Sequence, residues 1–71
     1  MSNPWNLTKR EEEVLSLMLE NAGAVKIAAD RLGISFKTAD TFLGRAKKRM
    51  GARTRFEALI QFDRWNRSVT A

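Results

Sequence analysis

The stretch Ala28-Ala29-Asp30-Arg31-Leu32-Gly33-Ile34-Ser35 decides the fold of this chain. Its alanines are small enough to let two helices come close, and Gly33 suits the left-handed residue that commonly ends a helix. Leu32 and Ile34 supply apolar groups that we expect to be buried around the turn, and Ser35 is a good N-cap for a following helix. The stretch therefore predicts two helices joined by a tight turn, the helix-turn-helix arrangement.

Two capping boxes mark the starts of further helices. Thr8 is followed three residues later by Glu11, and Thr54 is followed in the same way by Glu57. In such a box the two side chains satisfy backbone N–H groups that a helix start leaves unpaired. The chain therefore predicts an all-α, four-helix helix-turn-helix domain with a single small core. The expected helices span residues 9–21, 24–32, 35–50 and 54–66.

The length and composition restrict the kind of protein. The chain has 71 residues, which is enough for one domain, and it contains no cysteine and no histidine. Thiolate or imidazole metal sites and histidine acid–base chemistry are therefore excluded. No apolar run is long enough to cross a bilayer, and the N-terminus lacks the layout of a signal peptide. We expect a cytoplasmic protein that is not an enzyme and has no cofactor, no metal and no membrane partner.

We expect one helix-turn-helix domain over residues 1–71. Residues 1–6 would form an N-terminal extension, residues 7–66 the helical core and residues 67–71 a tail.

The expected third helix has two different faces. One stripe is apolar and consists of Ala39, Leu43, Ala46 and Met50. The opposite stripe is polar and basic, and consists of Lys37, Thr41, Arg45 and Lys48. Basic charge is dense between residues 37 and 55. This segment contains one acidic residue, Asp40, and seven basic residues: Lys37, Arg45, Lys47, Lys48, Arg49, Arg53 and Arg55. Such a helix can enter the major groove of DNA, about 12 Å wide, although a basic face can also serve only to keep a protein soluble.

These features resemble the LuxR-type (GerE-type) helix-turn-helix domain. The resemblance is carried by Leu7-Thr8-Lys9-Arg10-Glu11, Glu13-Val14-Leu15, Ile34-Ser35, Lys37-Thr38, Arg49-Met50-Gly51, Arg55 and Glu57-Ala58-Leu59. It covers residues 7–62 and departs from the family at Phe42, where a polar residue is usual. It implies a tetrahelical domain whose third helix enters the major groove and whose fourth helix often mediates dimerisation. We expect this domain to be a stand-alone small protein.

The candidate DNA-binding residues follow from these stripes. Lys37, Thr41 and Arg45 lie in the part of the third helix that usually meets base edges. Lys48, Arg49, Arg53 and Arg55 are expected to hold the DNA backbone. The full set is Lys37, Thr38, Thr41, Arg45, Lys48, Arg49, Arg53 and Arg55.

The fourth helix has two apolar stripes. We expect Phe56, Leu59 and Ile60 to face the core. The second stripe consists of Ala58, Phe62 and Trp65, and a small domain has difficulty covering it, which makes it a candidate homodimer surface. The alternative is that Trp65 folds back on Trp5, or on Leu15 and Leu19, to complete the core.

Two functions remain open. The first is a sequence-specific, DNA-binding transcriptional regulator that acts on double-stranded DNA as a homodimer. The second is a stand-alone antiactivator that binds and inhibits a larger transcriptional regulator by protein contact. Aromatic residues are enriched at protein interfaces, and this chain has Phe36, Phe42, Phe62 and Trp65 available for such contacts.

Overall fold

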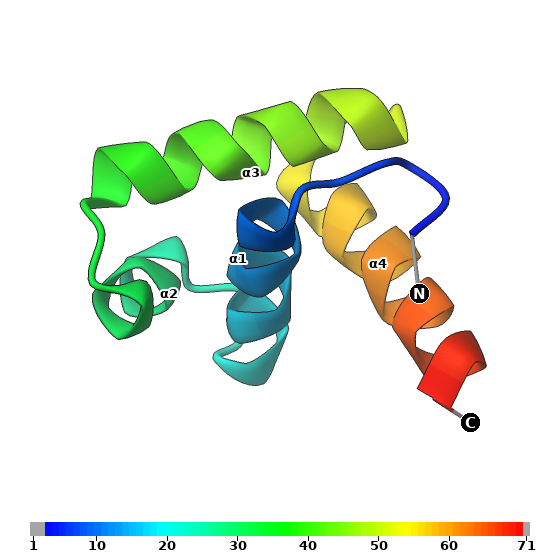
Figure 1. Cartoon of the computed structure of the whole chain (residues 1–71), viewed down its shortest axis with the longest axis horizontal. Helices are drawn as coiled ribbons and strands as arrows, with labels where there is room; N and C mark the ends of the chain where they lie inside the picture. Colours follow the sequence, from blue (N-terminus) through cyan, green and yellow to red (C-terminus); the bar gives the residue numbers. More distant parts are fainter. Residues whose placement is uncertain (1–2, 71) are drawn as a thin grey trace.

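The computed structural model describes residues 3–70, which form four helices. They are α1 (Lys9–Glu20), α2 (Val25–Leu32), α3 (Phe36–Met50) and α4 (Arg55–Thr70). α3 lies along one edge of the molecule, and the other three helices lie on one side of it (Figure 1). α1 is central and packs against each of the others. None of the helices in residues 3–70 is long and apolar enough to cross a lipid bilayer.

The helix-turn-helix is formed by α2 and α3. Gly33 ends α2 in the left-handed conformation, with a φ of 70°. Ser35 caps α3, since its hydroxyl oxygen accepts a hydrogen bond from the backbone N–H of Thr38 at 3.1 Å. Both features confirm what the sequence predicts for the turn.

The capping boxes differ from each other. In the first box, Thr8 Oγ1 accepts from the N–H of Glu11 at 3.2 Å, and the carboxylate of Glu11 accepts from the N–H of Thr8 at 2.9 Å. In the second, Thr54 Oγ1 accepts from the N–H of Glu57 at 3.1 Å. The Glu57 carboxylate, however, accepts from the backbone N–H of Arg53, at 3.4 Å, and not from that of Thr54. The first box is therefore complete, and the second is only half formed.

The core lies where α1 meets the other helices. Val14, Leu15 and Met18 of α1 have no exposed surface. The apolar stripe that the sequence predicts on α3 is confirmed, because Ala39, Leu43, Ala46 and Met50 are all buried. The opposite side of α3 is therefore left facing solvent.

The face of α4 that enters the core is only partly the expected one: Leu59 is buried as predicted, but its two companions Phe56 and Ile60 are not. Phe56 and Ile60 are 65% and 55% exposed, whereas Ala58 and Phe62 are 0% and 2% exposed. This corrects the expectation that Ala58, Phe62 and Trp65 form an exposed stripe. Both stripes of α4 are apolar, so periodicity alone could not show which of them faces α1.

In α2, too, a large apolar side chain is exposed while smaller ones are buried. Ile27 is 40% exposed, while Val25, Ala28 and Ala29 are buried. These three positions follow the i, i+3, i+4 spacing of one helix face, and Ile27 lies off it. The sequence pattern of this helix predicts that Ile27, Ala28 and Leu32 are buried. Ala28 is buried and Leu32 is partly buried, whereas the prediction for Ile27 is wrong.

The ends of the core also differ from the expected boundaries. Asn3 is 6% exposed, and Trp5 packs against the core. At the other end, α4 continues through Thr70 rather than ending near Asn66. Residues 3–6 and 67–70 are therefore parts of the folded unit, while residues 1, 2 and 71 of the expected extension and tail lie outside the described residues.

Candidate nucleic-acid interface

The outer face of α3 carries most of the candidate DNA-binding side chains. It turns away from α1, because it lies opposite the buried stripe. The exposed side chains on it are Lys37, Thr38, Thr41, Arg45 and Lys48. The structure therefore brings these five residues to one accessible surface.

Two threonines on this face have defined hydrogen bonds. Thr41 Oγ1 donates to the backbone carbonyl oxygen of Lys37 at 2.9 Å. Its hydroxyl proton is used within the helix, so Thr41 offers its methyl group and an acceptor lone pair to a ligand. The hydroxyls of Ser35 and Thr38 lie 2.8 Å apart at the helix start. The N-terminal part of α3 thus presents a fixed polar surface between Lys37 and Arg45.

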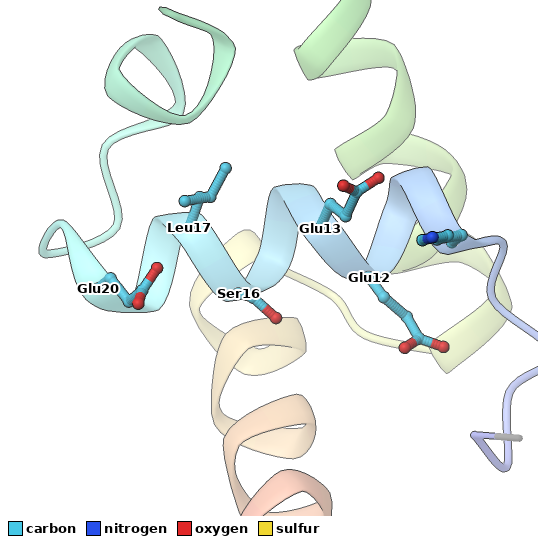
Figure 2. A pocket seen from close by; sticks show the side chains of 6 residues that line it. Glu12, Glu13, Ser16, Leu17 and Glu20 are labelled. Carbon is cyan, nitrogen blue, oxygen red and sulfur yellow. The ribbon is translucent and has the colours of Figure 1, made fainter. Parts of the chain in front are cut away.

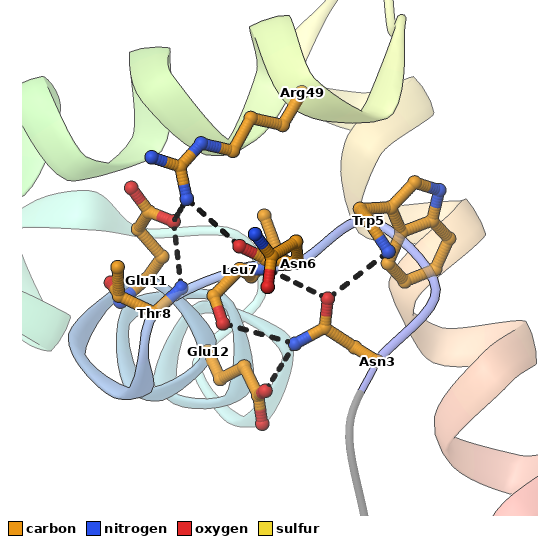
Figure 3. Close-up of polar contacts among 8 residues, drawn as sticks. All are labelled: Asn3, Trp5, Asn6, Leu7, Thr8, Glu11, Glu12 and Arg49. Carbon is orange, nitrogen blue, oxygen red and sulfur yellow. Dashed lines mark hydrogen bonds and ion pairs between the residues drawn. The ribbon is translucent and has the colours of Figure 1, made fainter.

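Arg49 differs from the other candidates because its guanidinium is paired within the domain, although 44% of the side chain is exposed. Its Nη1 atom lies 3.2 Å from Glu11 Oε1 and donates to the carbonyl oxygen of Asn6 at 2.9 Å (Figure 3). Glu11 is 1% exposed, so Arg49 supplies the positive charge that a buried carboxylate requires. The sequence predicts a DNA-backbone contact for Arg49, whereas the structure gives it a partner inside the domain.

Asn3 holds the segment that supplies the Asn6 carbonyl. Its Oδ1 accepts from the backbone N–H groups of Trp5, at 3.1 Å, and Leu7, at 2.7 Å. Its Nδ2 donates to the Leu7 carbonyl oxygen and to the Glu12 carboxylate (Figure 3). This role of Asn3 is not predicted from the sequence, although asparagine is a common residue in turns of this kind.

The start of α4 adds positive charge beside α3. Arg53 and Arg55 are both exposed, the first before α4 and the second as its first residue. Arg55 lines a hollow of about 200 Å³ together with Asp40, Leu43, Gly44 and Lys47 of α3. Arg55 is therefore near enough to α3 to extend its basic surface.

A larger hollow of about 390 Å³ lies on the outer face of α1. Lys9, Glu12, Glu13, Ser16, Leu17 and Glu20 line it. Their side chains are spread along the helix rather than converging on one point (Figure 2). Within residues 3–70, no three acidic side chains are grouped so as to hold a metal ion. An acidic surface repels a polyanion, so α3 remains the better candidate for a nucleic-acid interface.

The fold and this basic face define a helix-turn-helix DNA-binding domain. The family model of bacterial regulatory proteins of the LuxR family matches residues 5–62, and the chain belongs to this family. Membership makes the chain a non-enzymatic, DNA-binding domain of transcriptional regulation. No curated protein and no solved structure matches the chain.

Proposed function

We propose that the chain is a sequence-specific transcriptional regulator that inserts α3, the expected recognition helix, into the major groove of double-stranded DNA. The observation that carries this proposal is the division of α3 into a buried apolar stripe and an exposed basic face. A single helix fits the major groove, and an outward row of lysine, arginine and threonine can reach base edges and phosphates there.

The side chains divide into two groups by their position. Lys37, Thr41 and Arg45 face outward from the N-terminal two thirds of α3, which favours contacts with base edges. The residues proposed to contact the DNA backbone are Thr38, Lys48, Arg53 and Arg55. Arg49 acts indirectly, because its guanidinium ties α3 to α1 through Glu11.

Salt dependence tests the proposal. If each protomer neutralises about four to six phosphates, the log–log slope of affinity against salt should be roughly −4 to −5 per protomer. A mobility shift with genomic fragments at several salt concentrations measures this slope, and the mass of the complex should be determined in parallel. A slope near zero would exclude electrostatic DNA binding.

We infer that the protein acts as a homodimer through the exposed stripe of α4. Phe56 and Ile60 lie one helical turn apart and are the most exposed large apolar side chains of the helix. The same stripe continues with Asp63 and Arg67, which pair at 3.0 Å. If two copies cross at Phe56 and Ile60, the two-fold axis places the apolar end of each stripe against the same end of the other, with the charged pairs outside the contact. Two recognition helices would then lie about one DNA turn, roughly 34 Å, apart.

Antiactivation by protein contact is the second candidate function. The observation that favours it is the exposure of Phe36, Phe56 and Ile60, at 54%, 65% and 55%. Large exposed aromatic side chains are typical of protein interfaces. A variant in which Arg45 and Lys48 are both changed to alanine separates the two functions. An antiactivator should still inhibit its target regulator after this change, whereas a DNA-binding regulator should lose its activity.

A further inference from the structure

Gly44 is a helical glycine that the fold itself does not require. It lies inside α3, and a glycine there makes the helix less stable than alanine would. A Cβ atom at Gly44 would meet no other atom within 4 Å. Gly33 and Gly51 differ from it, because their φ angles of 70° and 67° favour glycine. Neither packing nor backbone conformation in the chain therefore explains Gly44.

The position of Gly44 on α3 indicates what the glycine is for. It is exposed and lies three residues after Thr41 and four residues before Lys48, on the face proposed to meet DNA. It also opens into the hollow of about 200 Å³ that Lys47 and Arg55 line. The absent side chain thus leaves a gap in the basic surface, with a cation from each of two helices beside it.

We propose that Gly44 is the point of closest approach between α3 and DNA, and that Lys47 and Arg55 hold a phosphate group beside it. The inference rests on the proposed DNA-binding function. Without a side chain at residue 44, the helix backbone can make van der Waals contact with the wall of the groove. Any larger residue would hold α3 away and lengthen the neighbouring charged contacts.

Asp40 is the acidic residue of the hollow, and its charge limits how the DNA can lie. A carboxylate repels phosphate, but it can accept a hydrogen bond from the N4 amino group of cytosine. The side of the hollow at Lys47 and Arg55 therefore suits the DNA backbone, and the side at Asp40 suits a base edge.

Two substitutions at the same position test the inference. Gly44→Ala and Gly44→Leu introduce residues of similar helix propensity and different size. Both should raise the Tm, by about 4–8 °C for a domain of this length. The affinity for a duplex selected by the wild-type chain from a random library should fall by about tenfold for alanine and about a hundredfold for leucine, the range typical of steric overpacking.

Ser16→Leu is the matched control. It replaces one neutral residue by leucine in a hollow of about 440 Å³ between α1 and α4. Ser16 lies on the side of α1 away from α3 (Figure 2), so the affinity for the same duplex should not change.

The outcomes separate this inference from the proposed function. If both Gly44 variants bind the duplex as tightly as the wild type, the close approach is refuted while DNA binding stands. The inference is also wrong if neither variant raises the Tm, because the fold would then need the glycine. If the wild-type chain selects no duplex at all, the proposed function and this inference fail together.

Discussion

The indole ring of Trp65 packs edge-on against that of Trp5, with ring centroids 6.1 Å apart and an angle of 70° between the planes. Phe62 also contacts Trp65, with 5.7 Å between the ring centroids. The contact ties the segment before α1 to the C-terminal half of α4. Trp65 lies beyond the range of residues 5–62 that matches the LuxR family model.

The tryptophan contact predicts coupled losses of stability. Trp5→Ala and Trp65→Ala should each lower the free energy of unfolding by about 1–3 kcal/mol, less than a fully buried tryptophan because both rings are only half-buried. The two losses should be non-additive by about 0.5–1.5 kcal/mol, which is the value of an aromatic pair beyond its buried area. Urea unfolding of the single and double variants measures the coupling. Strict additivity would show that the rings do not interact.

The sequence predicted the helices more reliably than the faces of α4. The capping boxes, Gly33 and the stripe of α3 are local signals, and all appear in the structure except for half of the second capping box. The orientation of α4 is not local, because it depends on Trp5 reaching Trp65 from the other end of the chain. The alternative that Trp65 folds back on Trp5 is confirmed, and it explains why Phe62 is buried while Phe56 is exposed.

Arg49 should be needed for stability rather than only for binding. Arg49→Ala would leave the buried Glu11 carboxylate without its cation, which should cost about 1–3 kcal/mol. Lys48→Ala is the control. Lys48 is the residue next to Arg49 and its side chain is exposed, so its removal should change the free energy of unfolding by less than about 0.5 kcal/mol. Thermal unfolding compares them. Equal Tm values for the two variants would contradict the structural role of Arg49.

The basic residues between positions 37 and 55 serve two purposes, because most are exposed for a ligand and Arg49 pairs with a buried carboxylate. The candidate DNA-binding site was therefore only partly predictable. Charge density from residue 37 to residue 55 predicted an exposed basic surface, and the structure places all of the candidate side chains in exposed positions, with Arg49 alone also paired to the buried Glu11. The sequence could not show that Glu11, already used in a capping box, is also buried against α3. That pairing joins residues 38 positions apart.

Arg45 and Lys48 should differ in their effect on specificity. Arg45→Ala should lower the affinity for a selected site by about 1–3 kcal/mol and relax the base preference at one position. Lys48→Ala should weaken binding to all duplexes alike and reduce the salt slope by about one. Fluorescence anisotropy with the selected and a scrambled duplex measures both effects. If the two variants lose the same affinity for both duplexes, the assignment of Arg45 to base edges is wrong.

Ile60→Glu tests the proposed dimer surface. Ile60 is 55% exposed, so a charged residue there should leave the fold intact and disrupt an apolar contact between two copies. The variant should have the wild-type helix content and Tm but the mass of a monomer by sedimentation equilibrium. Its affinity for a two-half-site duplex should fall close to that for a single half-site, because the second recognition helix is no longer held at high effective concentration.

Phe62→Glu is the contrasting variant for the same experiment. Phe62 is 2% exposed, and a buried charge without a partner should unfold the domain rather than yield a folded monomer. If Ile60→Glu keeps the oligomeric state of the wild type, the stripe of Phe56 and Ile60 is not the dimer surface. If the wild-type chain is itself a monomer and Ile60→Glu abolishes binding to a regulator protein without affecting DNA binding, the stripe serves protein contact and antiactivation becomes the better account of this helix.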